Sequence, residues 1–191
     1  MFIQTEKTPN PETLKFLPGR PVMGSGVRDF VSAEEAMVSP LARALFDLSG
    51  VKGVFLAEDF ISVTKSDETD WSRLKPMALA AIMDHFMTGL PVIDDAGAVG
   101  DGHEDETVYE GETLEIVNQI KDLIDTRVRP AVAGDGGDIV FRHFDDDSGV
   151  VKLVLRGACS GCPSSTLTLK QGIENMLKVY VPEVTSVEAV L

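Results

Sequence analysis

Apolar residues in the first 93 positions are spaced in a way that predicts a small α+β unit. Runs at 1–8, 13–17, 51–57 and 60–65 have the alternation, or the β-branched and aromatic content, of strands. Two stretches with helical spacing interrupt them. The predicted order is strand, strand, helix, strand, strand, helix, and nothing in this part of the chain is a catalytic motif.

Capping residues mark the predicted ends of both helices. Ser39 is a good N-cap and Pro40 fits the first helical position, so we expect the first helix to run from Pro40 to Gly50. The second is expected from about Pro76 to Gly89, because proline is tolerated in the first turn and glycine commonly ends a helix.

The second helix carries two apolar stripes, which predict either deep packing or an additional partner. The stripes hold Met77, Ala78, Ala81, Ile82 and Phe86, and Leu79, Met83 and Met87. We expect Met83 and Met87 to fill the core, since methionine adapts to irregular gaps, with a partner-facing role as the alternative. We expect His85 to be a packed histidine rather than a ligand, because no Cys or second His is near it in sequence.

The pattern after position 113 predicts helix, strand, strand, helix, strand. The first helix, 113–130, has Thr113 as its candidate cap and Pro130 as its end. Its inward residues are Leu114, Val117, Ile120, Leu123, Ile124 and Val128. The second helix, 163–182, is expected to turn inward Leu169, Ile173, Met176, Leu177 and Tyr180.

The strands of this second block lie at 139–145, 150–157 and 183–191, and the first two form a hairpin with a turn at 146–149. A glycine-rich loop, AVAGDGGD at 131–138, precedes them. A tight turn explains this loop without any chemistry.

Charge divides the chain into the same two blocks. The net charge is −14, and residues 94–113 account for −8 of it, with eight acidic residues and no Lys or Arg. Such a segment buries too little apolar surface to offset its ordering entropy, so we expect an extended acidic linker. An acidic dock, or a metal-collecting tract around His103, is the alternative. The predicted domains are therefore residues 1–93 and 114–191, two small α+β domains joined by a flexible linker at 94–113.

Composition excludes several classes of protein. The acidic charge argues against binding nucleic acid through phosphates, which needs a basic face. No apolar run has the length of a membrane span, and no signal peptide opens the chain. We expect no membrane partner and a cytoplasmic chain, or one in the mitochondrial matrix if a transit peptide was removed. Two cysteines exclude a disulfide framework.

The candidate chemistry lies in RGACSGCPSS at 156–165, which contains both cysteines, Cys159 and Cys162. Pro163 suits a first helical turn, which puts Cys162 at the N-cap, where the helix dipole lowers a thiol pKa. Thiolates are what metals and clusters bind. The small residues around them leave room for a bulky inorganic group.

Three uses of a C-x-x-C pair remain besides a pair of inert buried cysteines: disulfide exchange, a zinc site and an iron-sulfur cluster. Disulfide exchange is disfavoured because the motif comes late in its domain, whereas thioredoxin-type motifs come early. Zinc and clusters want four ligands, and no histidine has zinc-finger spacing, since His143 lies inside a predicted strand. A symmetric dimer, with two thiolates from each chain, completes the set most simply.

The residues resemble a known family. The stretches RPAVAGDGGDI (129–139) and GACSGCPSS (157–165) resemble the NifU-like C-terminal domain of Nfu-type iron-sulfur cluster carriers. FIQTEKTPNPETLKFLPG (2–19) and LKPMALAAIMDHFMTGLPVI (74–93) resemble the domain that accompanies it in mitochondrial and α-proteobacterial members. Both resemblances together cover nearly the whole chain outside the acidic segment.

The resemblance implies a carrier or scaffold, not an enzyme, that holds a 4Fe-4S cluster between two subunits. It would receive the cluster from upstream assembly proteins and pass it to apo-proteins. Only Cys159 and Cys162 carry over as cluster ligands. Asp135, Gly136, Gly137 and Asp138 match the family's glycine-rich loop, and we assign them no chemistry. Exposed thiols on a surface loop, few per chain, would suit release by exchange with incoming thiolates.

Overall fold

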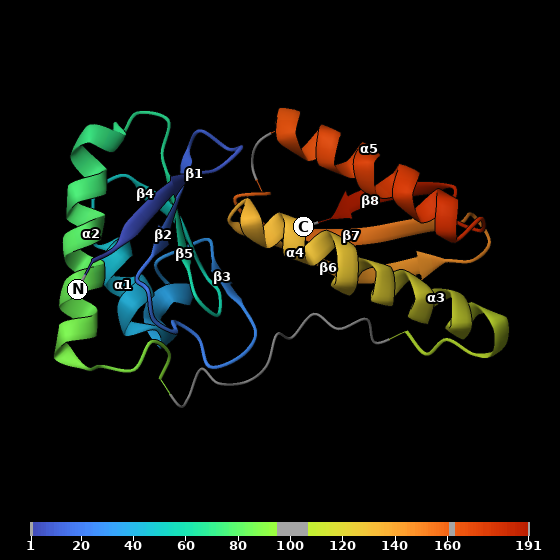
Figure 1. The fold of residues 1–191 in the computed structure, drawn as a ribbon, viewed down its shortest axis with the longest axis horizontal. Coiled ribbons are helices and arrows are strands. Elements are labelled where there is room, and N and C mark those ends of the chain that lie inside the picture. Colours follow the sequence, from blue (N-terminus) through green and yellow to red (C-terminus); the bar gives the residue numbers. More distant parts are fainter. Residues whose placement is uncertain (1, 95–106, 161–162, 191) are drawn as a thin grey trace. The chain divides into compact units, whose positions relative to one another are not determined.

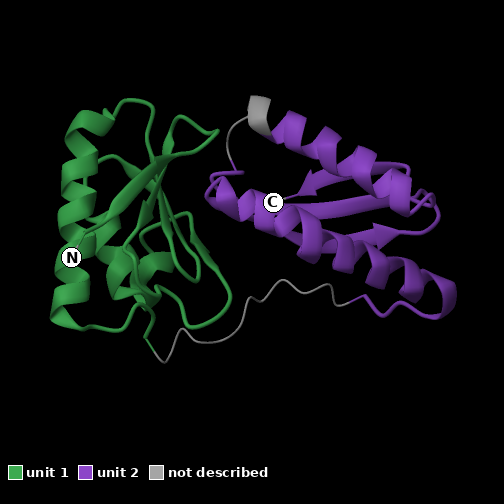
Figure 2. Cartoon of the chain, in the orientation of Figure 1, with its two compact units in different colours: residues 1–102 green, residues 103–191 purple. Residues whose placement is uncertain are grey.

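The chain forms two compact units, residues 1–102 and 103–191 (Figure 2). The computed structural model describes residues 2–94, 107–160 and 163–190, with the backbone alone at 163–165. Each unit combines a sheet with helices, which confirms the α+β prediction (Figure 1). No helix among these residues is long and apolar enough to cross a bilayer.

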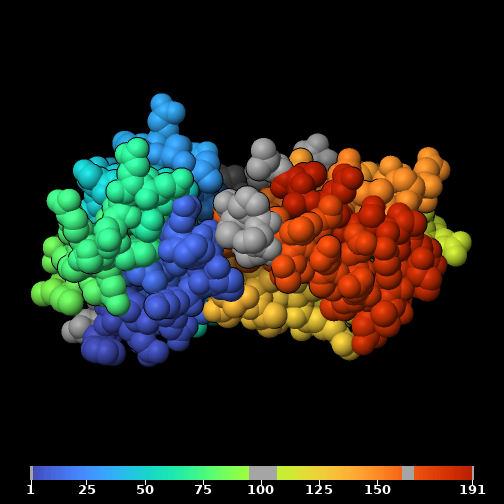
Figure 3. All heavy atoms as spheres, turned by 90° about the horizontal axis from the view of Figure 1, so that it is seen from above, coloured from blue at the N-terminus to red at the C-terminus, as the bar shows by residue number. Residues whose placement is uncertain are grey.

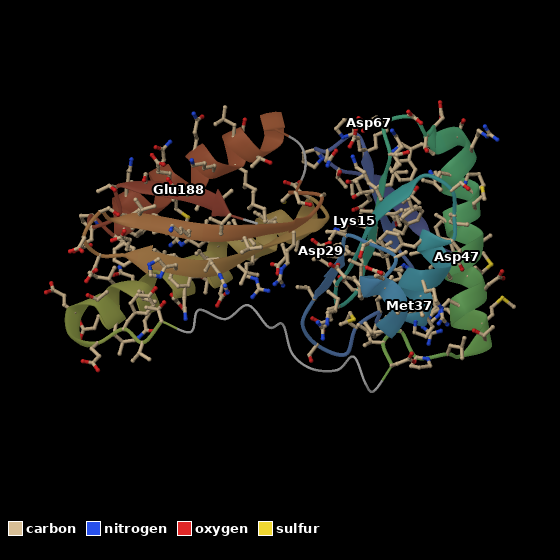
Figure 4. The ribbon with its side chains drawn as sticks, turned by 180° about the vertical axis from the view of Figure 1, so that it is seen from behind. Lys15, Asp29, Met37, Asp47, Asp67 and Glu188 are labelled. Carbon is tan, nitrogen blue, oxygen red and sulfur yellow. The ribbon has the colours of Figure 1, made fainter. Side chains whose placement is uncertain are left out.

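Unit 1 is a five-stranded antiparallel sheet in the order β1-β2-β5-β4-β3, with helices packed on one face. Its elements are β1 Gln4–Lys7, β2 Thr13–Leu17, β3 Arg28–Phe30, the 3-10 helix η1 Glu35–Val38, α1 Pro40–Phe46, β4 Val51–Leu56, β5 Ile61–Lys65 and α2 Trp71–Thr88. The four predicted strands are confirmed. The short β3 and η1 were not predicted, and η1 carries the exposed Met37 labelled in Figure 4.

Ser39 caps α1 as predicted, because its Oγ accepts a hydrogen bond from the Ala42 N–H at 3.0 Å. The predicted end at Gly50 is wrong, since α1 stops at Phe46. The predicted start of α2 at Pro76 is also wrong. The Asp70 carboxylate accepts from the Ser72 N–H at 2.7 Å and starts the helix at Trp71, which leaves Pro76 inside it. An effective N-cap outweighed the sequence signal of the proline.

The stripes of α2 divide between core and surface. Ala78 and Ile82 are fully buried and Met83 packs against the core, whereas Met77 and Met87 are exposed. The expectation of core filling is confirmed for Met83 and wrong for Met87, whose exposed fraction is 76%. Met87 lies one residue before the end of α2 at Thr88.

His85 is buried as predicted, and its Nε2 has no hydrogen-bond partner among the described residues. Burial lowers the pKa of its imidazole because the charged form loses hydration. The unfolded chain then binds a proton at a higher pH than the folded unit does. The contribution of His85 to the free energy of unfolding is therefore fully present above a pH of about 6.5, the pKa of histidine in the unfolded chain. It falls as the pH drops below that value.

We expect unit 1 to unfold at a lower urea concentration at pH 5 than at pH 7.5. Between these values its free energy of unfolding should fall by at most about 1.4 kcal/mol per pH unit, the limit for the binding of one proton. Fluorescence of Trp71, the single tryptophan, reports unit 1 alone. His85→Leu should flatten this slope. An unchanged slope in that variant would assign the pH dependence to other groups.

Unit 2 is a three-stranded sheet in the order β6-β7-β8, with β6 and β7 antiparallel and β7 and β8 parallel. Its elements are α3 Gly111–Leu123, the π-helix η3 Ile124–Val128, α4 Arg129–Gly134, β6 Gly137–Asp145, β7 Val150–Gly157, α5 Pro163–Tyr180 and β8 Ser186–Val190. Apolar residues of α3, η3 and α5 form one core with the three strands. The parallel β8 lies beside β7 because α5 carries the chain back across the sheet (Figure 1).

The first helix of unit 2 differs from its prediction at both ends. Thr113 is not its cap, because the helix begins at Gly111 and the Thr113 hydroxyl donates to the Asp146 carboxylate at 3.1 Å. Pro130 does not end it. A π-helical turn passes the chain from α3 into α4, where Pro130 takes an N-terminal position at which a missing N–H costs little.

The predicted glycine-rich loop at 131–138 is mostly regular structure. Residues 131–134 belong to α4, and Gly137 already begins β6, so only Asp135 and Gly136 remain as a turn. Gly136 has a φ of 83°, which favours glycine. The tight turn is thus confirmed but shorter than expected.

The second helix of unit 2 is confirmed, with Ile173 and Leu177 buried. Tyr180 is an exception, being 42% exposed, because its ring lies 4.7 Å from the Arg127 guanidinium and its hydroxyl accepts a hydrogen bond from that residue. Leu167 and Val179 are exposed on the outer side of α5, which forms much of the orange and red surface in Figure 3.

Candidate functional site

Cys159 lies in a tight turn directly after β7, where the strand meets the start of β6. Gly157, with a φ of 61°, turns the chain out of the strand. The Ala158 N–H then donates to the Gly136 carbonyl at 3.2 Å, and the Cys159 N–H donates to the Arg156 carbonyl at 3.4 Å. The first of these bonds ties the cysteine turn to the turn at Gly136, and the second closes the cysteine turn on the end of β7.

The Cys159 side chain is packed inward. The residue is 8% exposed and belongs to the hydrophobic cluster of unit 2. A Cβ placed on Gly137 would lie 2.7 Å from the Cys159 Sγ and 2.6 Å from the Arg156 carbonyl oxygen. Only a residue without a side chain therefore allows the sulfur to lie there.

The surroundings of Cys159 disfavour its thiolate. Burial, followed by the negative charges of Asp135 and Asp138, raises the pKa of the Cys159 thiol to about 12. The thiol is consequently protonated at neutral pH in the chain without metal. Metal coordination removes a thiol proton outright, so these surroundings do not prevent ligation.

An ion pair between the buried Asp138 and the partly exposed Arg129 supports the other side of the site. Asp138, 4% exposed, accepts two hydrogen bonds from Arg129, at 2.8 Å from Nε and 2.9 Å from Nη2. The hydrogen bond to Asp138 is the main reason that the pKa of Arg129 is raised. Asp125 adds a weaker contact to Arg129 at 3.3 Å. The pair fixes the beginning of β6 to the beginning of α4.

A residue near the start of α5, the helix that follows the cysteines, also contacts the cysteine turn. The Thr166 hydroxyl donates to the Cys159 carbonyl at 3.1 Å, which joins the second turn of α5 to the cysteine. The Ser160 hydroxyl donates to the Gly157 carbonyl at 2.8 Å and closes the turn locally.

The structure tests only part of what the sequence predicts for the two cysteines. The expectation that both cysteines lie exposed on a surface loop is wrong for Cys159, because Gly137 opens a space for its sulfur in the interior. Cys162, with its predicted N-cap position and lowered pKa, lies outside the described residues, as does His103. The ligand role of both cysteines stays a prediction.

The other histidines do not join the site. His143 is in β6 as predicted, and its Nδ1 lies 2.9 Å from the Tyr109 hydroxyl. The same hydroxyl accepts from the Phe144 N–H at 2.9 Å, which fastens the segment before α3 to β6. His85 belongs to unit 1.

Sequence reasoning assigns no role at the site to four residues that support it: Arg129, Gly137, Asp138 and Thr166. The sequence predicts Gly137 only as part of a turn. Arg129 and Asp138 are nine positions apart in sequence and on different elements, so no periodic pattern connects them. Thr166 is one of several hydroxyl residues near the start of α5.

Comparison with known proteins places both units. Residues 3–89 match the family model described as "Scaffold protein Nfu/NifU N terminal", and residues 120–188 match the "NifU-like domain". The human "NFU1 iron-sulfur cluster scaffold homolog, mitochondrial" is 50% identical over 192 residues, covering 100% of this chain and 72% of the relative.

A relative from a plant shows the same likeness. "NifU-like protein 4, mitochondrial" of Arabidopsis thaliana is 51% identical over 98% of this chain, and the match covers 65% of the relative, so this chain spans about two-thirds of these relatives' length. The solution structure of a NifU-like protein from Saccharomyces cerevisiae is 26% identical, with a TM-score of 0.45 over 50% of this chain and 86% of that one. On the two family models and the relatives that share half of its residues, the chain belongs to the family of Nfu-type, NifU-like iron-sulfur cluster scaffold proteins.

Proposed function

We propose that the chain binds a 4Fe-4S cluster between two copies of itself, through Cys159 and Cys162 of each, and transfers it to apo-proteins. The observation that carries this proposal is a C-x-x-C pair between β7 and α5 in a chain of the Nfu family, with no other cysteine in the sequence. A four-iron cluster commonly takes four thiolates, and each chain supplies two. The cluster is cargo, delivered by upstream assembly proteins.

The residues around Cys159 are compatible with such a group. Gly157 and Ala158 add little bulk beside the sulfur, and the Asp138 carboxylate is neutralised by Arg129. A cluster bound by thiolates carries net negative charge, so a paired aspartate repels it less than a free one would.

Two findings favour a carrier over the runner-up, a thiol-disulfide oxidoreductase. A redox cysteine reacts as its thiolate, and burial together with the nearby Asp135 and Asp138 carboxylates raises the pKa of the Cys159 thiol, which disfavours that form at this cysteine. The family of the chain is a scaffold family. We therefore infer that the protein is not an enzyme. A zinc-bridged dimer is the other candidate, and colour separates it, since iron-sulfide clusters absorb visible light and zinc does not.

Anaerobic reconstitution tests the proposal. After incubation with iron and sulfide, we expect visible absorption, two irons and two sulfides per chain, and a dimer by size-exclusion chromatography with light scattering. The cluster-free chain should shift toward monomer, because the energy of assembly resides in the metal-thiolate bonds. Four irons on a monomer would contradict the bridging, and bound zinc in a colourless protein would contradict the cluster.

We propose that residues 94–113 act as an acidic linker between domains 1–93 and 114–191. Within this segment, Tyr109 is fastened to β6 through the Phe144 N–H, so its last residues stay with unit 2. Limited proteolysis should therefore cut between 94 and 106 and leave two resistant fragments. Full protection of this stretch in the intact chain would refute the linker.

We propose that unit 2 holds the cluster and unit 1 influences which apo-proteins receive it. Unit 1 contains no cysteine, and α2 exposes Met77 and Met87. A fragment of residues 107–191 should bind the cluster as the whole chain does but transfer it to fewer apo-proteins. Equal transfer to every apo-protein tested would exclude a role of unit 1 in target choice. A fragment that binds no cluster would instead contradict the division itself.

The names of two relatives support a proposal for the compartment. Those from Arabidopsis thaliana and Homo sapiens carry "mitochondrial" in their names. We propose the mitochondrial matrix for a eukaryotic source and the cytoplasm for a bacterial one. Apo iron-sulfur proteins and assembly proteins are the expected partners, with no nucleic acid or membrane among them.

A further inference from the structure

The Cys159 sulfur is packed too closely on its Gly137 side to leave room for a bound cluster there. A metal-thiolate bond is about 2.3 Å long, and the rest of a cluster must fit behind the bound iron. On the Gly137 side of the sulfur there is no room even for a methyl group. The residue is otherwise packed into the hydrophobic cluster of unit 2.

We propose, on the basis of the cluster-binding function above, that the chain holds the Cys159 sulfur in a closed position against Gly137, and that cluster loading requires its release. Gly137 and Thr166 are then positioning residues for this cysteine. The first provides the space for the sulfur, and the second holds the backbone that carries it.

The contacts on the two sides of the turn are of unequal strength. On the β6 side, Gly137 is fixed by the adjacent Asp138, which Arg129 binds through two charge-assisted hydrogen bonds. On the α5 side, Cys159 is held through its carbonyl by the single hydroxyl of Thr166 at 3.1 Å. A neutral hydrogen bond is weaker than the ion pair, so the turn should open at Thr166 while Gly137 stays in place.

A closed position would also protect the thiol when no cluster is bound. Oxidation and alkylation need access to the sulfur, and the packed sulfur of Cys159 offers little. In this proposal, the closed turn keeps the Cys159 thiol unreactive, and opening of the turn exposes it as a ligand.

Alkylation tests the closed position without any cluster. The Cys162→Ser chain leaves Cys159 as the single thiol, and its reaction is timed with iodoacetamide and with the bulkier fluorescein maleimide, folded and in urea. A raised pKa slows both reagents alike, whereas packing slows the larger one more. We expect the rate ratio of small to bulky reagent to be higher in the folded chain. The same ratio in folded and unfolded chains would overturn the proposal.

Thr166 variants test what holds the sulfur. Thr166→Val in the same background keeps the shape but removes the hydroxyl, and should speed the bulky reagent about 3- to 10-fold, the range for one hydrogen bond. Thr166→Ser keeps the hydroxyl and should behave as the parent. Because either change can weaken the whole unit, each alkylation rate is compared with the global unfolding rate of the same chain. Gly137→Ala, with Gly134→Ala as its control, removes the space for the sulfur and should likewise speed the bulky reagent beyond that unfolding rate. Unchanged rates in both Thr166→Val and Gly137→Ala would overturn the assignment.

Loading provides the second measurement. With both cysteines present, Thr166→Val should take up cluster faster than the parent and reach the same iron content. Slower uptake would show that the Cys159 sulfur already lies in a position suited to bind iron. It would overturn the proposal that loading requires its release. A parent chain that takes up no cluster would instead contradict the proposed function and leave the alkylation results standing.

Discussion

Cys159→Ser and Cys162→Ser should each abolish both the visible absorption of the reconstituted protein and its cluster-dependent dimer. Either change leaves two thiolates across a pair of chains, which is too few for a stable four-iron site. Cluster loading and dimer formation share the same bonds, so both should be lost together. Absorption spectra, iron analysis and light scattering, all anaerobic, measure the two effects on the same sample.

Ser160→Ala is the matched control for these variants. Ser160 lies between the two cysteines, and its hydroxyl donates a hydrogen bond to the neighbouring Gly157 carbonyl. Its replacement should leave both colour and dimer. If one cysteine variant kept a coloured dimer, the missing ligand would come from elsewhere in the chain and the four-cysteine arrangement would be wrong.

The second large effect is expected from Gly137→Ala, which should lower the free energy of unfolding of unit 2 by about 1–3 kcal/mol, the usual cost of overpacking. The added methyl meets the Arg156 carbonyl oxygen and the Cys159 sulfur at 2.6 and 2.7 Å, and the carbonyl belongs to backbone that cannot swing away. Urea denaturation of the cluster-free chain, followed by far-UV circular dichroism, measures the loss.

Gly134→Ala provides the control for position 137. Nothing lies within 4 Å of a Cβ at Gly134, the last residue of α4, so this variant should match or slightly exceed the parent in stability. Trp71 fluorescence should show the same unit 1 transition in all three chains. A Gly137→Ala chain as stable as the parent would mean that the turn relaxes at no cost.

Local patterns in the sequence were enough for the elements whose ends are chemically marked. Ser39 with Pro40 predicted the start of α1, and the hairpin of β6 and β7 followed from two apolar runs around a polar turn. Where a proline competed with another signal for the end of a helix, the prediction from sequence was wrong. The sequence predicts a helix start at Pro76, although Asp70 caps the helix six residues earlier. It predicts a helix end at Pro130, although a π-helical turn carries the chain past it.

The sequence by itself determined the two α+β blocks, the acidic segment between them and the pair of thiols, because spacing, charge and composition are properties of neighbouring residues. Only the tertiary structure decided the position of the Cys159 sulfur. The contacts that fix this position come from β6, α4 and α5. They are the packing of the sulfur against Gly137, the ion pair of Arg129 with Asp138, and the hydrogen bond from Thr166. Burial and charge around a side chain are set by whatever packs against it in space, so a thiol expected on the surface lies inside, with its pKa raised to about 12.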